Sequence, residues 1–229
     1  MKLVRNYFEE TVHNWKIALQ HSKFRNILLL TLAFYIVYFK LGRLIMAELE
    51  ARKGTQLIDP ILQLLPPHDL SVITFTFTYT ALSIFIILIV KNPIYFVRGL
   101  QGYTILSIMR AVSIYFVNLE PPTGMILLKD PVTVFFMQSK EGGYIVKDLF
   151  FSGHVSTIMF FHFLSHDRRL KRALLVIAVI VGTLILFQHV HYTIDVVAAP
   201  FFSFLAYRCT IWVNDYIHKD SPVLSMIRK

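Results

Sequence analysis

Residues 71–90 read SVITFTFTYTALSIFIILIV, a stretch without a charged side chain. As an α-helix this stretch would rise about 30 Å, which is the thickness of the hydrocarbon core of a bilayer. Further apolar blocks, each about long enough to cross or nearly cross that core, lie at residues 27–46, 99–118, 149–164, 173–189 and 192–213. We therefore predict an all-α, polytopic membrane protein that folds as a single six-transmembrane-helix bundle.

The composition leads to the same class of protein. Hydrophobic residues make up 55% of the 229 residues and charged residues 16%, whereas soluble domains carry roughly 25% charged residues. The mean hydropathy is +0.58. These values exclude a soluble globular enzyme, and the single cysteine excludes a disulfide-bonded scaffold.

The formal net charge of +9 is explained by topology without nucleic-acid binding. Six spans place both termini on one side, together with 15 of the 23 Lys and Arg residues. Seven lie on the other side, and Arg110 lies within a span. Because Lys and Arg concentrate in cytoplasmic loops, we predict cytoplasmic termini, extracytoplasmic loops on the other side, and no nucleic-acid partner.

The sequence predicts three parts: a cytoplasmic amphipathic segment at 1–26, a six-helix membrane catalytic domain at 27–213 and a cytoplasmic basic tail at 214–229. The first part is too long and too charged to begin a cleaved signal peptide, so we expect the first span to be retained. Its apolar residues recur at helical spacing, at Val4, Phe8, Val12, Trp15 and Leu19. A helix on the membrane surface and a solvated amphipathic helix both fit this pattern.

Ser152, Gly153 and His154 stand at the predicted outer start of the fourth span, shortly after Asp148. Ser152 can cap free backbone N–H groups, and Gly153 lets another group approach the backbone closely. The positive end of a helix attracts phosphate, so His154 would face a bound anion. A histidine that only contacts lipid head groups fits the same tripeptide.

His191 and Asp195 stand four residues apart at the predicted outer start of the sixth span, which places them on one helix face. The carboxylate can fix the tautomer of the imidazole and leave the other nitrogen free to attack. A structural ion pair is the alternative. Six spans put His154 and His191 at the same membrane face, where they would supply a nucleophile and an acid. His189 points to a different helix face, which favours a supporting or packing role.

Arg110 lies about eight residues before the end of the third span, roughly 12 Å below the membrane surface. Arginine at that depth usually faces a polar cavity, where its guanidinium can bind phosphate oxygens in bidentate fashion. Structural pairing with a neighbouring acid is the alternative. The sequence contains no cluster of His and Cys with ligand spacing and no grouped carboxylates, so we expect no metal and no cofactor.

The chain resembles the phosphatidic acid phosphatase type 2 superfamily of lipid phosphatases and phosphotransferases, and within it the sphingomyelin synthase branch. The resemblance covers roughly residues 60–210 and depends on the order and spacing of several motifs. They are Pro66-Pro67-His68-Asp69, Arg110 to Tyr115 with Pro121-Pro122-Thr123-Gly124, Asp148 to Ser152-Gly153-His154, and His191-Tyr192-Thr193-Ile194-Asp195-Val196.

The resemblance implies a double displacement at phosphorus. His191 would form a phosphohistidine, Asp195 would orient it, and His154 would protonate the leaving oxygen. Arg110 and the helix start at Ser152 would stabilise the charged oxygens. The remaining residues that the resemblance adds to substrate binding are Gly153, Asp148 and Tyr192.

The sequence departs from the family pattern at several motif positions, namely Val146, Lys147, Val155 and Pro200. Ile185 stands where superfamily members with soluble substrates place an arginine, so we assign the phosphate contact to Arg110.

We expect a phospholipid head-group phosphotransferase at the extracytoplasmic face of a membrane. Its partners would be a phospholipid donor and an acceptor, which is ceramide, diacylglycerol or water. A lipid phosphate phosphatase or phospholipase C-like hydrolase of the same superfamily is the nearest alternative. A non-catalytic membrane scaffold or transporter is the alternative from another class. The lack of cysteine pairs favours a bacterial inner membrane over a eukaryotic endomembrane, and the sequence leaves the oligomeric state open.

Overall fold

The structure is a computed structural model, and it describes residues 2–127 and 146–218. Helices account for the regular structure of these residues, which confirms the all-α prediction for them. The helices are α1 (Lys2–Gln20), α2 (Ser22–Ala51), α3 (Pro60–Gln63), α4 (Ser71–Val90), α5 (Pro93–Phe116), α7 (Gly153–Leu164), α8 (Arg168–Phe187) and α9 (Thr193–His218).

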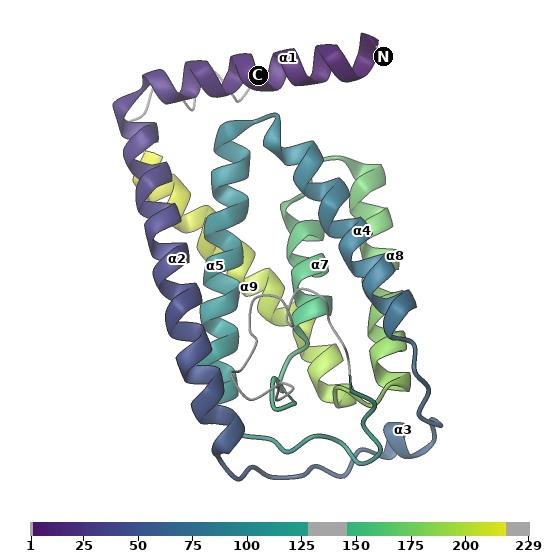
Figure 1. Cartoon of the computed structure of the whole chain (residues 1–229). Coiled ribbons are helices and arrows are strands. Elements are labelled where there is room, and N and C mark those ends of the chain that lie inside the picture. Colours follow the sequence, from purple (N-terminus) through teal and green to yellow (C-terminus); the bar gives the residue numbers. More distant parts are fainter. Residues whose placement is uncertain (1, 128–145, 219–229) are drawn as a thin grey trace.

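The long helices run side by side, while α1 lies across one end of them (Figure 1). The short helix α3 and the N-terminal ends of α7 and α9 lie at the opposite end. The last described turn of α9 is at the same end as α1. The structure therefore brings the starts of α7 and α9 together, far from α1.

Four helices are long and apolar enough to cross a membrane: α2, α4, α8 and α9 over Thr193–Asp215. Helix α7 has 12 residues, which gives a rise of about 18 Å, short of the roughly 30 Å core. Helix α5 has 24 residues but contains Arg98 and Arg110. The described helices thus confirm several apolar membrane-type helices, and the count of six full spans stays a prediction.

Two predicted helix starts were wrong because charged side chains interrupt the apolar run near the start of each helix, Arg98 in α5 and Arg168 to Arg172 in α8. Asn92 accepts a hydrogen bond from the backbone N–H of Tyr95 (3.1 Å), so α5 begins at 93 instead of 99. Asp167 likewise caps α8 through the N–H of Leu170 (2.7 Å), so α8 begins at 168 instead of 173.

The remaining boundary corrections concern three helix ends. Helix α2 spans 22–51, beyond the predicted 27–46 at both ends. Helix α9 continues to 218, so the tail predicted from 214 begins inside it. Helix α7 begins at 153 instead of 149, because a tight turn precedes it.

The core of the bundle is built around α7. Phe160 is fully buried, and Phe161 stacks on Phe85 of α4 with ring centroids 4.1 Å apart. Gly102 of α5 allows the close approach of α7, since a Cβ there would lie 2.2 Å from the ring of Phe160. Because α4, α5, α8 and α9 all contact α7, this short helix is held rigidly at the centre.

Large apolar side chains also cover the outside of the bundle. Exposed examples on the apolar helices are Leu30, Phe34, Val72, Val179, Val197 and Phe201. A water-soluble protein rarely exposes apolar surface on this scale, whereas lipid chains solvate it well. The structure therefore supports a membrane protein.

Helix α1 is fixed to the turn between α4 and α5. The indole N–H of Trp15 donates to the carbonyl oxygen of Val90 (2.7 Å), and the amide of Asn14 donates to that of Lys91 (3.0 Å). The ammonium of Lys91 also pairs with Glu10 at 2.8 Å. The amphipathic segment predicted at 1–26 thus contains a helix that lies across one end of the bundle (Figure 1).

Candidate active site

The two motifs predicted to carry chemistry meet at the starts of α7 and α9. Ser152 is the N-cap of α7, and its side chain accepts from the N–H of Val155. The backbone N–H of Ser152 in turn donates to the carbonyl oxygen of Asp195 (3.0 Å). This hydrogen bond joins the two helix starts directly.

His191 and Asp195 form a buried pair. The His191 Nδ1 lies 3.1 Å from the Asp195 Oδ2, and the backbone N–H of Tyr192 donates to the same oxygen at 3.1 Å. Asp195 is fully buried and His191 is 5% exposed. Because the carboxylate faces Nδ1, the stable neutral tautomer carries its proton there and leaves the lone pair on Nε2.

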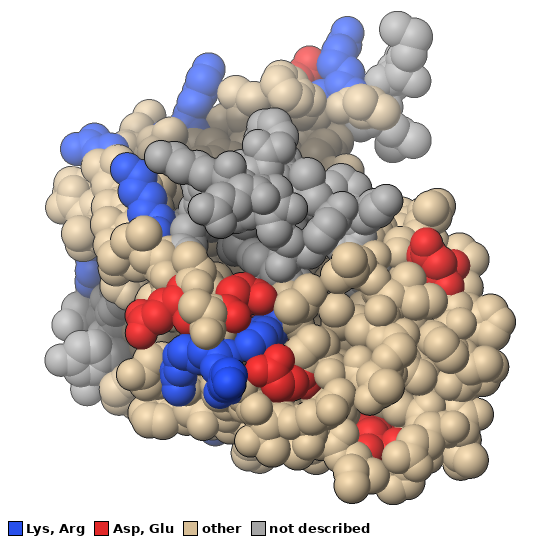
Figure 2. Space-filling view, turned by 60° about the horizontal axis from the view of Figure 1, so that its bottom comes forward, with Lys and Arg blue, Asp and Glu red and all other residues tan. Residues whose placement is uncertain are grey.

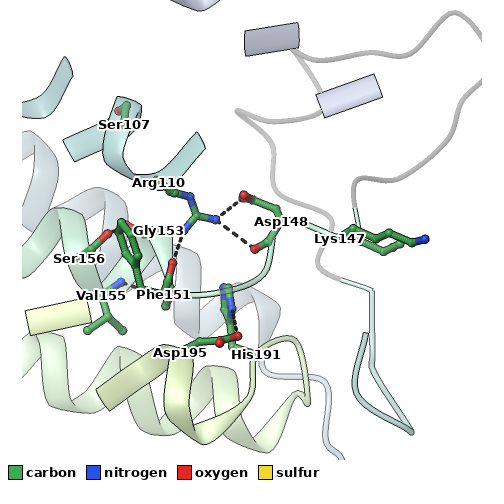
Figure 3. A network of polar contacts seen from close by, with 12 residues as sticks. Ser107, Arg110, Lys147, Asp148, Phe151, Gly153, Val155, Ser156, His191 and Asp195 are labelled. Carbon is green, nitrogen blue, oxygen red and sulfur yellow. Dashed lines mark hydrogen bonds and ion pairs between the residues drawn. The ribbon is translucent and has the colours of Figure 1, made fainter. Parts of the chain in front are cut away.

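Arg110 reaches from α5 to the segment before α7 (Figure 3). Its guanidinium pairs with the Asp148 carboxylate (Nη2 to Oδ2, 2.5 Å) and donates to the carbonyl oxygens of Asp148 (3.1 Å) and Phe151 (2.5 Å). The pairing with a neighbouring acid, which we considered as the alternative for Arg110, is therefore present, and its partner is Asp148.

Gly153 provides the space that this guanidinium occupies. A Cβ at Gly153 would lie 2.9 Å from both Cζ and Nη1 of Arg110. Such a distance is too short for real Cβ contacts, so any larger residue would displace the arginine. We expected Gly153 to let another group approach the backbone closely, and in the structure that group is the Arg110 guanidinium.

The turn before α7 is strained. Phe150 and Phe151 have φ values of 67° and 29°, a left-handed conformation that non-glycine residues rarely adopt. Phe151 is fully buried and stacks on Phe202 of α9 with ring centroids 4.4 Å apart. Packing thus holds this turn in place, and the turn directs the Phe151 carbonyl oxygen at Arg110.

Asp148 links Arg110 to both motif histidines. Burial acts to raise the pKa of its carboxyl, but the charge of Arg110, its hydrogen bond and the proximity of His191 and His154 outweigh this and lower the pKa. Asp148 is therefore a carboxylate at neutral pH. Since both histidines act electrostatically on one side chain, the site brings together Arg110, Asp148, His154 and His191.

His154 lies in the first turn of α7 and is half-buried. Its ring faces Phe75 of α4, with ring centroids 5.8 Å apart. Helix α4 thus forms one wall beside this histidine.

Tyr192 is buried, and its hydroxyl holds the outer loops. It donates to the carbonyl oxygen of Glu120 (2.9 Å) and accepts from the N–H of Leu57 (3.2 Å). Burial raises the pKa of this phenol. The hydroxyl that we assigned to substrate binding is thus occupied by two loop contacts.

Asp59 is a residue that the sequence analysis missed. Its carboxylate accepts from the N–H of Thr193 (2.6 Å) and from the Thr193 hydroxyl (3.1 Å), so it caps the start of α9 from a distant loop. It also caps α3 through Ile61 and Leu62. The sequence Asp59-Pro60 could have indicated a capping role for Asp59 at the start of α3, because Asp before Pro is typical of a helix start.

At this end of the molecule basic and acidic side chains lie together in one mixed cluster, and further separate acidic and basic spots lie elsewhere on the face (Figure 2). The ammonium of Lys147 forms an ion pair with the Glu120 carboxylate at 2.8 Å. The backbone N–H groups of Val146 and Lys147 donate to Glu50. Lys147 points away from Arg110 (Figure 3), so it supports the loop and leaves the site to Arg110.

The described residues contain no group of three or more His, Cys, Asp or Glu side chains that could hold a metal ion. The groups at the site are instead a buried imidazole–carboxylate pair, a second histidine, an arginine and a helix N-terminus. Together they can attack a phosphorus centre, protonate a leaving oxygen and stabilise negative charge.

The family model for the C-terminal part of the PAP2 (phosphatidic acid phosphatase type 2) superfamily matches residues 147–217. The match supports the PAP2 superfamily. It includes both motif histidines and Asp195, and it indicates a lipid enzyme of the phosphatase or phosphotransferase type. Neither a curated protein nor a solved structure matches the chain.

Proposed function

We propose that this protein is a phospholipid head-group phosphotransferase, similar to sphingomyelin synthase, that works through a phosphohistidine on His191. The observation that carries the proposal is the contact between the His191 Nδ1 and the buried Asp195 carboxylate at 3.1 Å. This contact leaves Nε2 as the nucleophile beside the N-terminus of α7, where a phosphate is stabilised.

In the first step, Nε2 of His191 attacks the phosphorus of a phospholipid. The bond from phosphorus to the diacylglycerol oxygen breaks as the bond from nitrogen to phosphorus forms. His154, as an imidazolium, gives its proton to the departing oxygen, and Asp195 stabilises the positive charge that develops on His191.

In the second step, an acceptor hydroxyl attacks the phosphohistidine. His154, now neutral, takes the proton of the acceptor, and His191 leaves with its lone pair restored. Ceramide or diacylglycerol as acceptor gives a new phospholipid, whereas water gives hydrolysis. A lipid phosphate phosphatase or phospholipase C-like hydrolase therefore shares the same intermediate.

We infer that Arg110 and the first N–H groups of α7 stabilise the charged phosphoryl oxygens. The guanidinium lies against Gly153 and carries more N–H donors than its contacts to Asp148 and Phe151 use. Asp148 holds the arginine in this position. Tyr192 then supports the site by fixing the outer loops.

We place this site on the extracytoplasmic side, with the termini in the cytoplasm, because the predicted loops at the site end carry fewer Lys and Arg residues. Phospholipid would reach the site sideways from the outer leaflet.

The test uses purified protein in lipid nanodiscs with EDTA, and a panel of phospholipids with and without ceramide or diacylglycerol. Product masses are the readout. His191→Ala should lose at least about 10³-fold in turnover, because no other nucleophile replaces the imidazole. His13→Ala on α1, whose side chain is exposed, should retain turnover and serves as the matched control.

The products separate the alternatives. A new phospholipid that requires the acceptor identifies a transferase, and its mass identifies the head group. Free phosphate or free phosphoalcohol alone identifies a hydrolase. Full turnover by a folded His191→Ala variant would contradict the phosphohistidine mechanism, and no turnover by the wild type favours a scaffold or transporter.

A further inference from the structure

His189 ends α8 in an unusual way. Its φ is 54°, and its backbone N–H donates to the carbonyl oxygen of Leu186 (3.0 Å) while that of Val190 donates to Ile185 (3.3 Å). This pattern is a Schellman C-cap, whose left-handed position is normally glycine. A histidine with this positive φ strains the backbone. The contacts of its side chain must therefore offset that conformational cost.

The imidazole of His189 contacts two loops that are distant in sequence. Its Nδ1 lies 3.0 Å from the carbonyl oxygen of Thr123, and its Nε2 lies 2.9 Å from that of Leu65. The residue is 6% exposed. Carbonyl oxygens only accept hydrogen bonds, and a neutral imidazole has one N–H, so only the imidazolium can donate to both.

The same turn is attached to these loops by backbone hydrogen bonds. The N–H of His68 donates to the carbonyl oxygen of Phe187 (2.9 Å), and the N–H of Ile126 donates to that of Gln188 (3.0 Å). His191 follows two residues after His189. The contacts of His189 therefore fix the position of the nucleophile relative to both outer loops.

We propose that His189 is a positioning residue, held as an imidazolium, that clamps the loops at Leu65 and Thr123 to the turn carrying His191. Its effect on catalysis rests on the proposed function, whereas its protonation state does not. Without the second proton one of the two carbonyl oxygens lacks its donor, and the loop on that side keeps only its backbone hydrogen bond to the turn.

The charged and titratable groups on the segments around His189 have partners of their own. On the Leu65 loop, the Asp69 carboxylate accepts from Ser71, and the His68 ring lies 2.8 Å from the Pro66 carbonyl oxygen. On the Thr123 loop, Glu120 pairs with Lys147. On its own turn, His191 pairs with Asp195. The carbonyl oxygens of Thr123 and Leu65 are the acceptors that face the two ring nitrogens of His189.

The first test reads the protonation directly. Full-length protein labelled with ¹⁵N-histidine in nanodiscs gives ring-nitrogen NMR signals, and the His189→Gln spectrum identifies those of His189. We expect both nitrogens to be protonated at neutral pH, because each faces a carbonyl oxygen. A neutral tautomer with one bare nitrogen at pH 7 would overturn the proposal whatever the activity.

The second test separates charge from packing in the lipid assay. His189→Gln keeps a polar side chain but lacks the cation, and we expect kcat to fall on the order of 10-fold with KM unchanged, because a misplaced nucleophile slows chemistry without weakening binding. His189→Lys, which keeps the charge and several donors, should recover most of kcat. His13→Gln on α1 should match the wild type.

Hydrogen exchange gives a third reading that needs no substrate. Peptides around residues 64–70 and 117–127 should exchange faster in His189→Gln than in the wild type and His189→Lys, while α7 is unchanged. Equal exchange in all variants, or a Lys variant as slow in kcat as the Gln variant, would contradict the clamp. An inactive wild type with a doubly protonated His189 would contradict only the proposed function.

Discussion

At the scale of single residues, Asp195 has a buried carboxylate whose two oxygens differ in their hydrogen bonding. Its side chain is fully buried, and Oδ2 accepts from both His191 and the Tyr192 N–H. Oδ1 has no hydrogen-bond partner within the described part of the chain. A buried acceptor left in this state costs about 1–3 kcal/mol, a cost that proteins tolerate mainly at functional sites.

Asp195→Asn should preserve the fold and remove activity. The amide has nearly the same size, but its NH₂ group would face Nδ1 and favour the tautomer with the proton on Nε2, which cannot attack. We expect turnover to fall on the order of 10²- to 10⁴-fold, measured with the lipid assay. A variant that retains wild-type turnover would show that the carboxylate does not orient the nucleophile.

Asp148 should make stability depend on acidic pH. Because the pKa of its carboxyl is lowered in the folded protein, the Arg110 pair stabilises the fold above about pH 4. The contribution disappears as the pH falls through the lowered value. The Asp148 side chain is 44% exposed, so we expect only about 1 kcal/mol after screening, which is about 2–4 °C in Tm.

Thermal unfolding of the wild type and Asp148→Asn, followed by size exclusion in detergent, checks this. The difference in Tm should be present at pH 7 and should shrink as the pH falls below about 4, because the pKa of Asp148 is lowered in the folded protein. A difference that persists in acid would mean that Asp148 stabilises the protein through packing.

At the scale of secondary-structure elements, the site depends on two helix starts that are fixed to each other. The Ser152 N–H bonds to the Asp195 carbonyl oxygen, and Asp59 holds the N–H of Thr193. Burial tends to raise the pKa of Asp59, but its hydrogen bonds from Thr193, Leu62 and Ile61 lower it, so this cap is charged at neutral pH. A negative charge at the start of α9 also interacts favourably with the helix dipole.

Gly153→Ala should disrupt the start of α7. The added Cβ would lie 2.9 Å from the Arg110 guanidinium, so the arginine must move away from the phosphoryl position. We expect turnover to fall about 10-fold or more. Gly42→Ala on α2 is the matched control, because a Cβ there meets no atom within 4 Å. Equal turnover in the two variants would refute the role of Arg110.

At the scale of the whole molecule, helix α1 and the candidate site lie at opposite ends of the bundle (Figure 1). Helix α1 covers one end, fixed by Trp15 and Asn14, and the site lies at the other end (Figure 1). Our topology assigns α1 to the cytoplasm and the site to the opposite face.

Cysteine labelling tests this topology, since Cys209 is the single cysteine. In a Cys209→Ala background, Lys16→Cys on α1 and Ile58→Cys on the site-end loop both replace exposed residues. A membrane-impermeant maleimide applied to intact cells should label Ile58→Cys and leave Lys16→Cys unlabelled until the cells are opened. The reverse pattern would place the site in the cytoplasm.

Local patterns were sufficient for much of the fold and of the chemistry. An uncharged stretch such as 71–90 forms a helix in any apolar environment, since its backbone must satisfy its own hydrogen bonds. The spacing of four residues predicted the contact between His191 and Asp195, but not its helical setting. Helix α9 begins at Thr193, so His191 lies in the turn before the helix and only Asp195 lies in its first turn. Ser152 as a cap followed from the same kind of local rule.

The tertiary structure alone determined which partners these residues meet across the chain. Arg110 pairs with Asp148 at a separation of 38 residues, and Asp59 caps α9 from a separation of 134 residues. No periodicity encodes such contacts, because they arise when the packing of α7 among its neighbours fixes where each loop ends. The sequence by itself determined an all-helical protein with membrane-type helices and predicted that His154 and His191 lie at one end of it. Packing decided that Arg110 is held by Asp148, that Tyr192 contacts the outer loops and that both ring nitrogens of His189 face carbonyl oxygens of these loops.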